Sequence, residues 1–160
     1  PYEELTDLKD CYTVVKHNVY EDVVKFHNHE KLFYKTRQSN LFKCMKNHID
    51  HTVTKAHGCK NPDECYINHE NKIMYIIEKK FQQVSGSVCE KIQTYDFKLW
   101  QYRRTFPNFE IVYIYCLSGW FQDNCKAEIE YFKETNVPVF WGNSKSYKQD
   151  IIDFIINYKQ

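Results

Sequence analysis

Residues 109–117 read FEIVYIYCL, an apolar run that only Glu110 interrupts. The period of so short a run does not separate a buried strand from a buried helix, but its β-branched and aromatic residues favour a strand. Residues 137–141, VPVFW, are also expected to be extended, because a residue that precedes proline avoids the helical region. Parallel pairing of the two segments would indicate an α/β sheet, whereas a wholly helical chain would exclude one.

Elsewhere the sequence predicts helices. Apolar residues recur at spacings of three and four within residues 6–35, which is typical of one helix face. Two later stretches carry helix start signals, Asn61-Pro62 and Ser87 with Glu90. Gly and Pro number only four each, and tight turns usually need them, so helices are favoured over strands. The expected helices are 6–35, 41–57, 61–86, 87–107, 125–134 and 146–158.

Cysteine content indicates the compartment. Seven cysteines in 160 residues are typical of an oxidising environment, in which six could pair and one would stay free. We therefore expect a secreted protein stapled by disulfides, whose connectivity the sequence leaves open. The candidate disulfide residues are Cys11, Cys44, Cys59, Cys65, Cys89, Cys116 and Cys125.

An internal repeat supports this interpretation. The stretch CYTVVKHNVYEDVVKF (11–26) is similar to CYINHENKIMYIIEKKF (65–81), with Tyr20 corresponding to Tyr75, and a later cysteine follows each stretch. A helical hairpin cannot bury its apolar face alone, so two hairpins packed together would make a core. An inter-helix disulfide would fix each hairpin, which favours Cys11 with Cys44 and Cys65 with Cys89.

We therefore predict a mainly α fold in a single domain, 1–160. It is a disulfide-stapled helical bundle with two related helical units at 7–58 and 61–106. A C-terminal extension, 107–160, can hold short strands.

Paired Cys-Tyr-Cys motifs in a secreted helical protein resemble the bicycle proteins, secreted effectors of gall-forming aphids. The motifs here are Cys11, Tyr20 and Cys44, then Cys65, Tyr75 and Cys89. The resemblance implies a salivary effector that is delivered into plant tissue and alters it by binding a host macromolecule.

The last third of the chain supports a different interpretation. YIYCLSGWFQDNCKAEIEYFKETNVPVFW (113–141) resembles the strand-turn-helix-strand unit of nucleoside deoxyribosyltransferase-like α/β enzymes. That resemblance implies that Asp123 contacts a ribose and that Glu128 is the nucleophile. The Gly-rich opening turn of that family is absent, since residues 1–60 contain one Gly. A solvated helix face beside Lys126 and Lys133 also accounts for Glu128.

Three other patterns in the sequence suggest further functions. Cys116 and Cys125 have the Cys-x8-Cys spacing of insect odorant-binding proteins, which suggests a secreted helical small-ligand carrier, but the Cys-x3-Cys pair of that class is absent. Zinc-binding side chains gather in the sequence without a standard zinc spacing; they are His48, His51, His57 and Cys59. The Arg103-Arg104 pair follows Trp100 and Tyr102, a mixture that can bind single-stranded nucleic acid.

The sum of these patterns favours binding over catalysis. A net charge of +1 supplies no strong field, so nucleic acid is not an expected partner. No apolar run is long enough to span a membrane. We expect an unidentified host protein as partner, no cofactor, no metal, and a secreted location.

Overall fold

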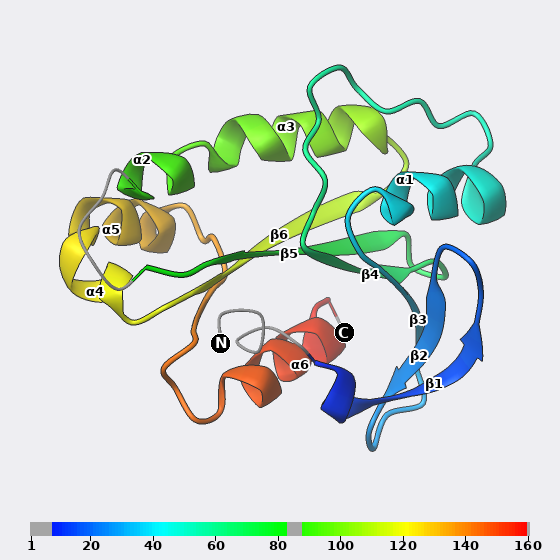
Figure 1. Cartoon of the computed structure of the whole chain (residues 1–160), viewed down its shortest axis with the longest axis horizontal. Coiled ribbons are helices and arrows are strands. Elements are labelled where there is room, and N and C mark those ends of the chain that lie inside the picture. Colours follow the sequence, from blue (N-terminus) through cyan, green and yellow to red (C-terminus); the bar gives the residue numbers. More distant parts are fainter. Residues whose placement is uncertain (1–7, 83–87, 160) are drawn as a thin grey trace.

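The computed structural model describes residues 8–82 and 88–159. Its centre is one sheet of seven strands that lie side by side in sequence order (Figure 1). Strands β1 to β5 pair antiparallel, and β5, β6 and β7 pair parallel. The strands are β1 (Tyr12–His17), β2 (Asp22–Phe26), β3 (Leu32–Thr36), β4 (Glu64–Asn68), β5 (Ile73–Lys80), β6 (Glu110–Leu117) and β7 (Val139–Trp141).

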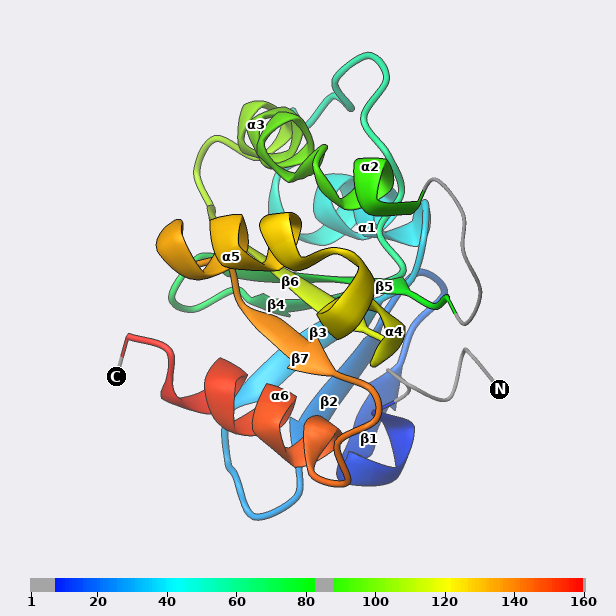
Figure 2. The same cartoon turned by 90° about the vertical axis from the view of Figure 1, so that its left-hand side faces the viewer.

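Helices cover both faces of this sheet. The connections from β5 to β6 and from β6 to β7 place α2, α3 and α5 on one face, whereas α6 lies on the other (Figure 2). The described helices are η2 (Lys9–Cys11), α1 (Asn40–Cys44), η3 (Met45–Ile49), α2 (Val88–Ile92), α3 (Tyr95–Thr105), α4 (Trp120–Asn124), α5 (Lys126–Glu134) and α6 (Tyr147–Asn157).

The two faces of the sheet form two separate cores because successive strand residues point to opposite sides. In β5, Met74 and Ile76 pack with α1, α3 and α5, whereas Tyr75 and Ile77 pack with α6. Strand β6 is buried along nearly its whole length. Its continuous apolar sequence follows from this position, since a parallel strand between helical layers contacts apolar side chains on both faces.

The mainly α prediction is wrong: the chain is an α/β protein. Segment 6–35 forms η2 and β1 to β3, and 61–86 forms the β4–β5 hairpin up to the last described residue, Gln82. The scarcity of Gly misled the prediction because other residues take the left-handed turn conformation in this chain. That conformation is normally costly for a residue with a side chain. These residues include Asn28, Gln38 and Lys72, whose φ angles are 68°, 51° and 56°.

The two units predicted at 7–58 and 61–106 are not helical hairpins, and the stretches that resemble each other within them correspond to two β-hairpins. Residues 11–26 contain β1 and β2, and residues 65–81 contain most of β4 and all of β5. The matched tyrosines are not equivalent, because Tyr20 lies in the β1–β2 turn whereas Tyr75 is buried within β5. The predicted C-terminal extension supplies β6, which pairs with β5 along eight residues.

Several C-terminal predictions are confirmed. Residues 109–117 contain β6, and this strand pairs in parallel with β7, within 137–141. The helices expected at 125–134 and 146–158 are α5 and α6. The helix expected at 87–107 is split into α2 and α3, and its first residue lies outside the described residues.

Candidate functional site

The β4–β5 hairpin brings three charged side chains to one place on the sheet. Glu64 lies opposite Ile77 in the antiparallel register, so Asp63 lies beside Glu78. Because side chains alternate along β5, Glu78 and Lys80 continue the face on which Ile76 packs beneath the helices. The apolar face of β5 thus becomes charged over its last three residues.

Backbone and side-chain contacts hold this trio, which we call the Asp-Glu-Lys site (Asp63, Glu78 and Lys80). The backbone N–H of Lys79 donates to Oδ2 of Asp63 at 2.9 Å. Nζ of Lys80 lies 3.3 Å from Oε1 of Glu78. The Glu78 side chain is 13% exposed and that of Lys80 is 25% exposed. Solvent therefore reaches the site only in part, and charges within it interact strongly.

Burial and neighbouring charges shift the pKa values of the acid and the lysine at the site. Burial raises the pKa of the Glu78 carboxyl, and the nearby Asp63 carboxylate raises it further. Lys80 and Lys98 lower that pKa, but only in part. Lys98 comes from α3, and burial lowers the pKa of its ammonium while Glu78 raises it. Two acids and two lysines thus share a confined space.

Such an arrangement fits a hard divalent cation. Mg²⁺ is usually held by one or two carboxylates, with its remaining positions left to water and substrate phosphate oxygens. Asp63 and Glu78 supply two carboxylates from neighbouring backbone positions, and Lys79 orients the first of them. A cation between them would remove the mutual repulsion that raises the pKa of Glu78.

Space for a substrate lies directly beyond Lys80. A pocket of about 400 Å³ opens at the carboxyl ends of the three parallel strands. Ligands of open α/β sheets bind at this edge. The Ser118 backbone N–H donates to the Lys80 carbonyl at 3.1 Å, which joins this pocket to the Asp-Glu-Lys site. The pocket is lined by Phe81, Gln82, Ser118, Gly119, Trp120, Gly142 and Asn143.

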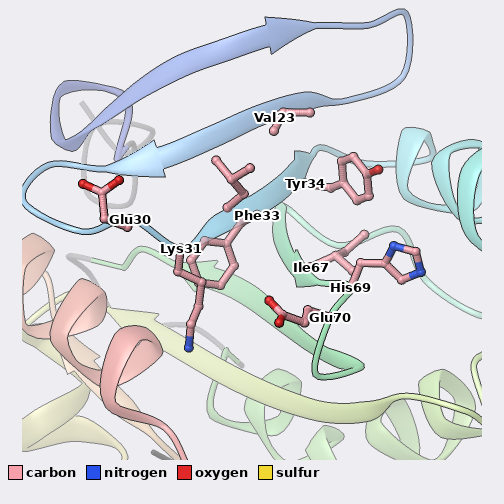
Figure 3. A pocket seen from close by; sticks show the side chains of 9 residues that line it. Val23, Glu30, Lys31, Phe33, Tyr34, Ile67, His69 and Glu70 are labelled. Carbon is pink, nitrogen blue, oxygen red and sulfur yellow. The ribbon is translucent and has the colours of Figure 1, made fainter.

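A slightly larger pocket, about 460 Å³, lies on the antiparallel part of the sheet. Figure 3 shows that its charged side chains, Glu30, Lys31 and Glu70, come from the loops at the strand ends and do not converge on one point. The Glu30 side chain is 95% exposed, so its charge is screened by water. This pocket lacks the partly buried acid pair of the Asp-Glu-Lys site and is a weaker candidate for catalysis.

The cysteines predicted as staples form one disulfide among the described residues, Cys89 with Cys125. The favoured pairs Cys11 with Cys44 and Cys65 with Cys89 are therefore wrong, and the other five cysteines form no disulfide. Those pairs rested on helical hairpins that the chain does not form. Four of these five cysteines are buried, and they act as small apolar core residues. They are Cys44, Cys59, Cys65 and Cys116.

The two carboxylates of the deoxyribosyltransferase interpretation are placed differently. Asp123 is exposed on α4. Glu128, on α5, accepts a hydrogen bond from Nε2 of Gln93 at 2.5 Å and lies near the sulfurs of Cys89 and Cys125. Neither residue lines a pocket described above. The solvated helix face remains the simpler account of Glu128.

The histidine cluster does not form a zinc site in the described part of the chain. Nε2 of His48 lies 2.7 Å from Oε1 of the buried Glu21. Cys59 is buried and its thiol lies near the Lys60 carbonyl. Within residues 8–82 and 88–159, the only group of three possible metal ligands is Cys89, Cys125 and Glu128, and its two sulfurs form the disulfide.

Sequence reasoning missed the Asp-Glu-Lys site because it assigned Asp63 and Glu78 to one helix. A usable signal was present: Pro62-Asp63 precedes one apolar run, and Glu78-x-Lys80 ends the next. Charged residues that directly follow a buried strand lie where that strand ends. Ligands of α/β sheets bind at the carboxyl ends of the strands. Reading the segment as a hairpin would have placed the three side chains together.

Comparisons with known proteins give no further guide to this site. No family model, curated protein or solved structure matches the chain.

Proposed function

We propose that this protein is a metal-dependent nuclease, which hydrolyses phosphodiester bonds of a nucleic acid at the Asp-Glu-Lys site. The observation that carries the proposal is the convergence of Asp63, Glu78 and Lys80 from paired strands on one partly buried face. One or two carboxylates can hold Mg²⁺, and an ammonium can stabilise the charge that develops on a phosphoryl group. The proposal reverses the expectation drawn from net charge, since a local group of cations serves in place of an overall field.

Each residue has a role that follows from its place. Asp63 and Glu78 would hold the cation, and the Lys79 N–H fixes the Asp63 carboxylate by a hydrogen bond to its Oδ2. When bound, the divalent ion polarises the phosphoryl oxygen and lowers the pKa of a water molecule. Lys80, whose Nζ lies 3.3 Å from Oε1 of Glu78, would orient the attacking water. Lys98 contributes a second positive charge toward the negative phosphate.

The reaction is a balanced hydrolysis. The water oxygen forms a bond to phosphorus, and the bond between phosphorus and one sugar oxygen breaks. The sugar oxygen leaves with the electron pair and gains a proton, while the water loses one. The products are a phosphomonoester and a free hydroxyl. This chemistry depends on positioning and charge stabilisation, which the two acids and two lysines provide.

A cleavage assay with end-labelled DNA and RNA, with and without Mg²⁺, tests the proposal. Asp63→Asn and Glu78→Gln keep the shape of each side chain but weaken metal binding, and we expect each to reduce cleavage at least about 100-fold. Asp123→Asn is the matched control, because Asp123 is an exposed carboxylate on α4. Cleavage by the wild type without a divalent ion, or undiminished cleavage by both site variants, would contradict the proposal.

A second candidate function rests on the parallel β6–β7 pairing. This pairing is the feature expected of a nucleoside deoxyribosyltransferase-like unit. In that function Glu128 would attack a nucleoside and Asp123 would bind its ribose. Release of free base from deoxynucleosides, abolished by Glu128→Gln, would support it. The exposed position of Asp123 makes it weaker than the nuclease proposal.

The secreted-effector function remains a proposal of another kind. It rests on the resemblance to the bicycle proteins and on the cysteine content, and a nuclease activity is compatible with it. One disulfide among seven cysteines weakens the argument for an oxidising compartment, since that argument assumed six paired cysteines. Among the described helices, none combines the length and apolar character that crossing a bilayer requires.

A further inference from the structure

Helix α3 carries three stacked planar groups on its outer side. Phe97 and Trp100 are 59% and 52% exposed. Their ring centroids lie 5.8 Å apart with an angle of 28° between the planes. The Arg104 guanidinium lies 5.3 Å from the centre of the Trp100 ring. We call this column of Phe97, Trp100 and Arg104 the α3 platform.

The platform is held in place from beneath. Leu99 and Tyr102, on the opposite side of α3, are buried in the core under the helix. The Tyr102 hydroxyl also donates to the Lys60 carbonyl at 2.6 Å. Because α3 is fixed to the sheet, its outer aromatic rings are presented with little conformational freedom left to lose on binding. Large rings kept exposed on a fixed helix mark a contact surface.

We propose that the α3 platform binds unpaired bases of a single-stranded nucleic acid segment through stacking on Phe97, Trp100 and the Arg104 guanidinium. This inference rests on the proposed nuclease function and names the form of its substrate. Bases stack on aromatic rings and on guanidinium planes whatever their sequence. Duplex DNA keeps its bases stacked inside the helix, so it offers the platform only its backbone.

The charges around the platform fit this partner. Arg103 and Arg104 are exposed at the end of α3 and can pair with phosphates. The acid on this side of the helix, Asp96, accepts a hydrogen bond from the Tyr131 hydroxyl. Alternating rings and cations favour a polyanion with planar bases over an apolar protein surface.

Helix α3, which carries the platform, also contributes a charge to the Asp-Glu-Lys site. Lys98 follows Phe97 directly on α3, and its charge interacts with Glu78 and Asp63. A strand whose bases lie on the platform can therefore pass around one side of α3 and bring a backbone phosphate to the acids. The sequence pattern of Trp100, Arg103 and Arg104 thus serves to bind nucleic acid, a partner that the net charge alone did not favour.

Binding of fluorescently labelled (dT)20, (rU)20 and a 20-base-pair duplex, measured by anisotropy in EDTA, tests the inference without cleavage. Stacking on one ring is worth about tenfold in affinity or more. We expect Phe97→Ala and Trp100→Ala each to weaken binding of at least one single-stranded probe about tenfold. Trp100→Phe should retain most of it. Leu32→Ala is the matched control, because Leu32 is 51% exposed on β3.

The outcomes separate this inference from the nuclease proposal. Wild-type binding of single strands with loss in both alanine variants supports the platform, whether or not Mg²⁺ then produces cleavage. Unchanged affinity in both alanine variants, or no single-strand binding by the wild type, overturns the platform even if the protein cleaves DNA. An equal loss of single-strand affinity in Leu32→Ala also overturns the platform, because the loss would then not be specific to residues of α3.

Discussion

The β1–β2 and β4–β5 hairpins have similar sequences but different positions in the sheet. Both contain a Cys-Tyr pair and end in Lys-Phe. In the first hairpin Lys25 is 3.8 Å from the exposed Glu30, and Phe26 is fully buried. In the second, Lys80 joins the Asp-Glu-Lys site and Phe81 is 38% exposed. The local sequence makes a hairpin in both places, and the neighbours decide what its side chains do.

The neighbours differ because β1 is the edge strand, whereas β5 is flanked by β4 and β6. Five of the six residues of β1 are exposed, and the first five of β5 are buried. Charged residues on β1 face water, where they interact weakly. Charged residues at the end of β5 lie under helix α3, where mutual repulsion and burial change their chemistry.

The largest expected difference between the hairpins is in activity. Lys80→Ala removes the ammonium next to Glu78 and should reduce Mg²⁺-dependent cleavage about 100- to 10,000-fold. Lys25→Ala at the corresponding position of the first hairpin should leave the rate unchanged. Single-turnover cleavage of labelled DNA measures both, and thermal melting checks that both variants fold. Similar rates for the two variants would remove Lys80 from the site.

A substitution in the second hairpin should also lower the free energy of unfolding more than one in the first. Ile76 is fully buried in the centre of β5, so Ile76→Ala should lower the free energy of unfolding by about 2–5 kcal/mol. Val15 in β1 is 57% exposed, so Val15→Ala should change it by about 0.5 kcal/mol or less. Urea denaturation measures both values. A large loss in Val15→Ala would show that β1 is covered by something in solution.

The C-terminal elements could be predicted because residue type or a clear helical period favoured one structure in each. The run 109–117 is too β-branched and aromatic for a good helix, and 146–158 has a helical stripe, so β6 and α6 were found. The N-terminal half was ambiguous. Its valines and tyrosines satisfy spacings of two as well as three and four, and the sheet that selects between them is made by residues far away.

The candidate site was hidden for the same reason. Asp63 and Glu78 are 15 positions apart, and only the antiparallel register makes them neighbours. On a helix they would not meet, so the first interpretation gave them no joint function. Asp123 and Glu128 attracted attention because a sequence pattern joined them, whereas the fold leaves Asp123 in solvent.

Among the described residues, a disulfide follows the second hairpin and none follows the first. Cys89–Cys125 closes a loop of 36 residues and joins α2 to the start of α5. Cys89→Ser should lower the free energy of unfolding by about 2–4 kcal/mol without reductant and by little with it. Cys11→Ser is the control just before the first hairpin, because Cys11 takes part in no disulfide. Denaturation of each variant with and without reductant measures the difference. Equal sensitivity of wild type and Cys89→Ser to reductant would mean that the disulfide does not form.

The smallest expected difference concerns pH. The pKa of Glu78 is raised in the folded protein, so the folded state holds this proton more tightly than the unfolded chain. The metal-free protein should therefore lose stability as pH rises from the ordinary glutamate pKa through the raised one. Glu78→Gln should be more stable than the wild type at neutral pH and no more stable in acid, below both pKa values.

Glu30→Gln in the loop after β2 is the matched control and should leave the pH dependence unchanged, because the Glu30 side chain is 95% exposed. Mg²⁺ should reverse the ranking at neutral pH, since the ion stabilises the wild type by binding the carboxylate that Glu78→Gln lacks. Melting temperatures of the wild type and both variants across pH, with and without Mg²⁺, measure these differences in stability. A wild type that gains no stability from Mg²⁺ would show that the acids repel each other without serving a metal.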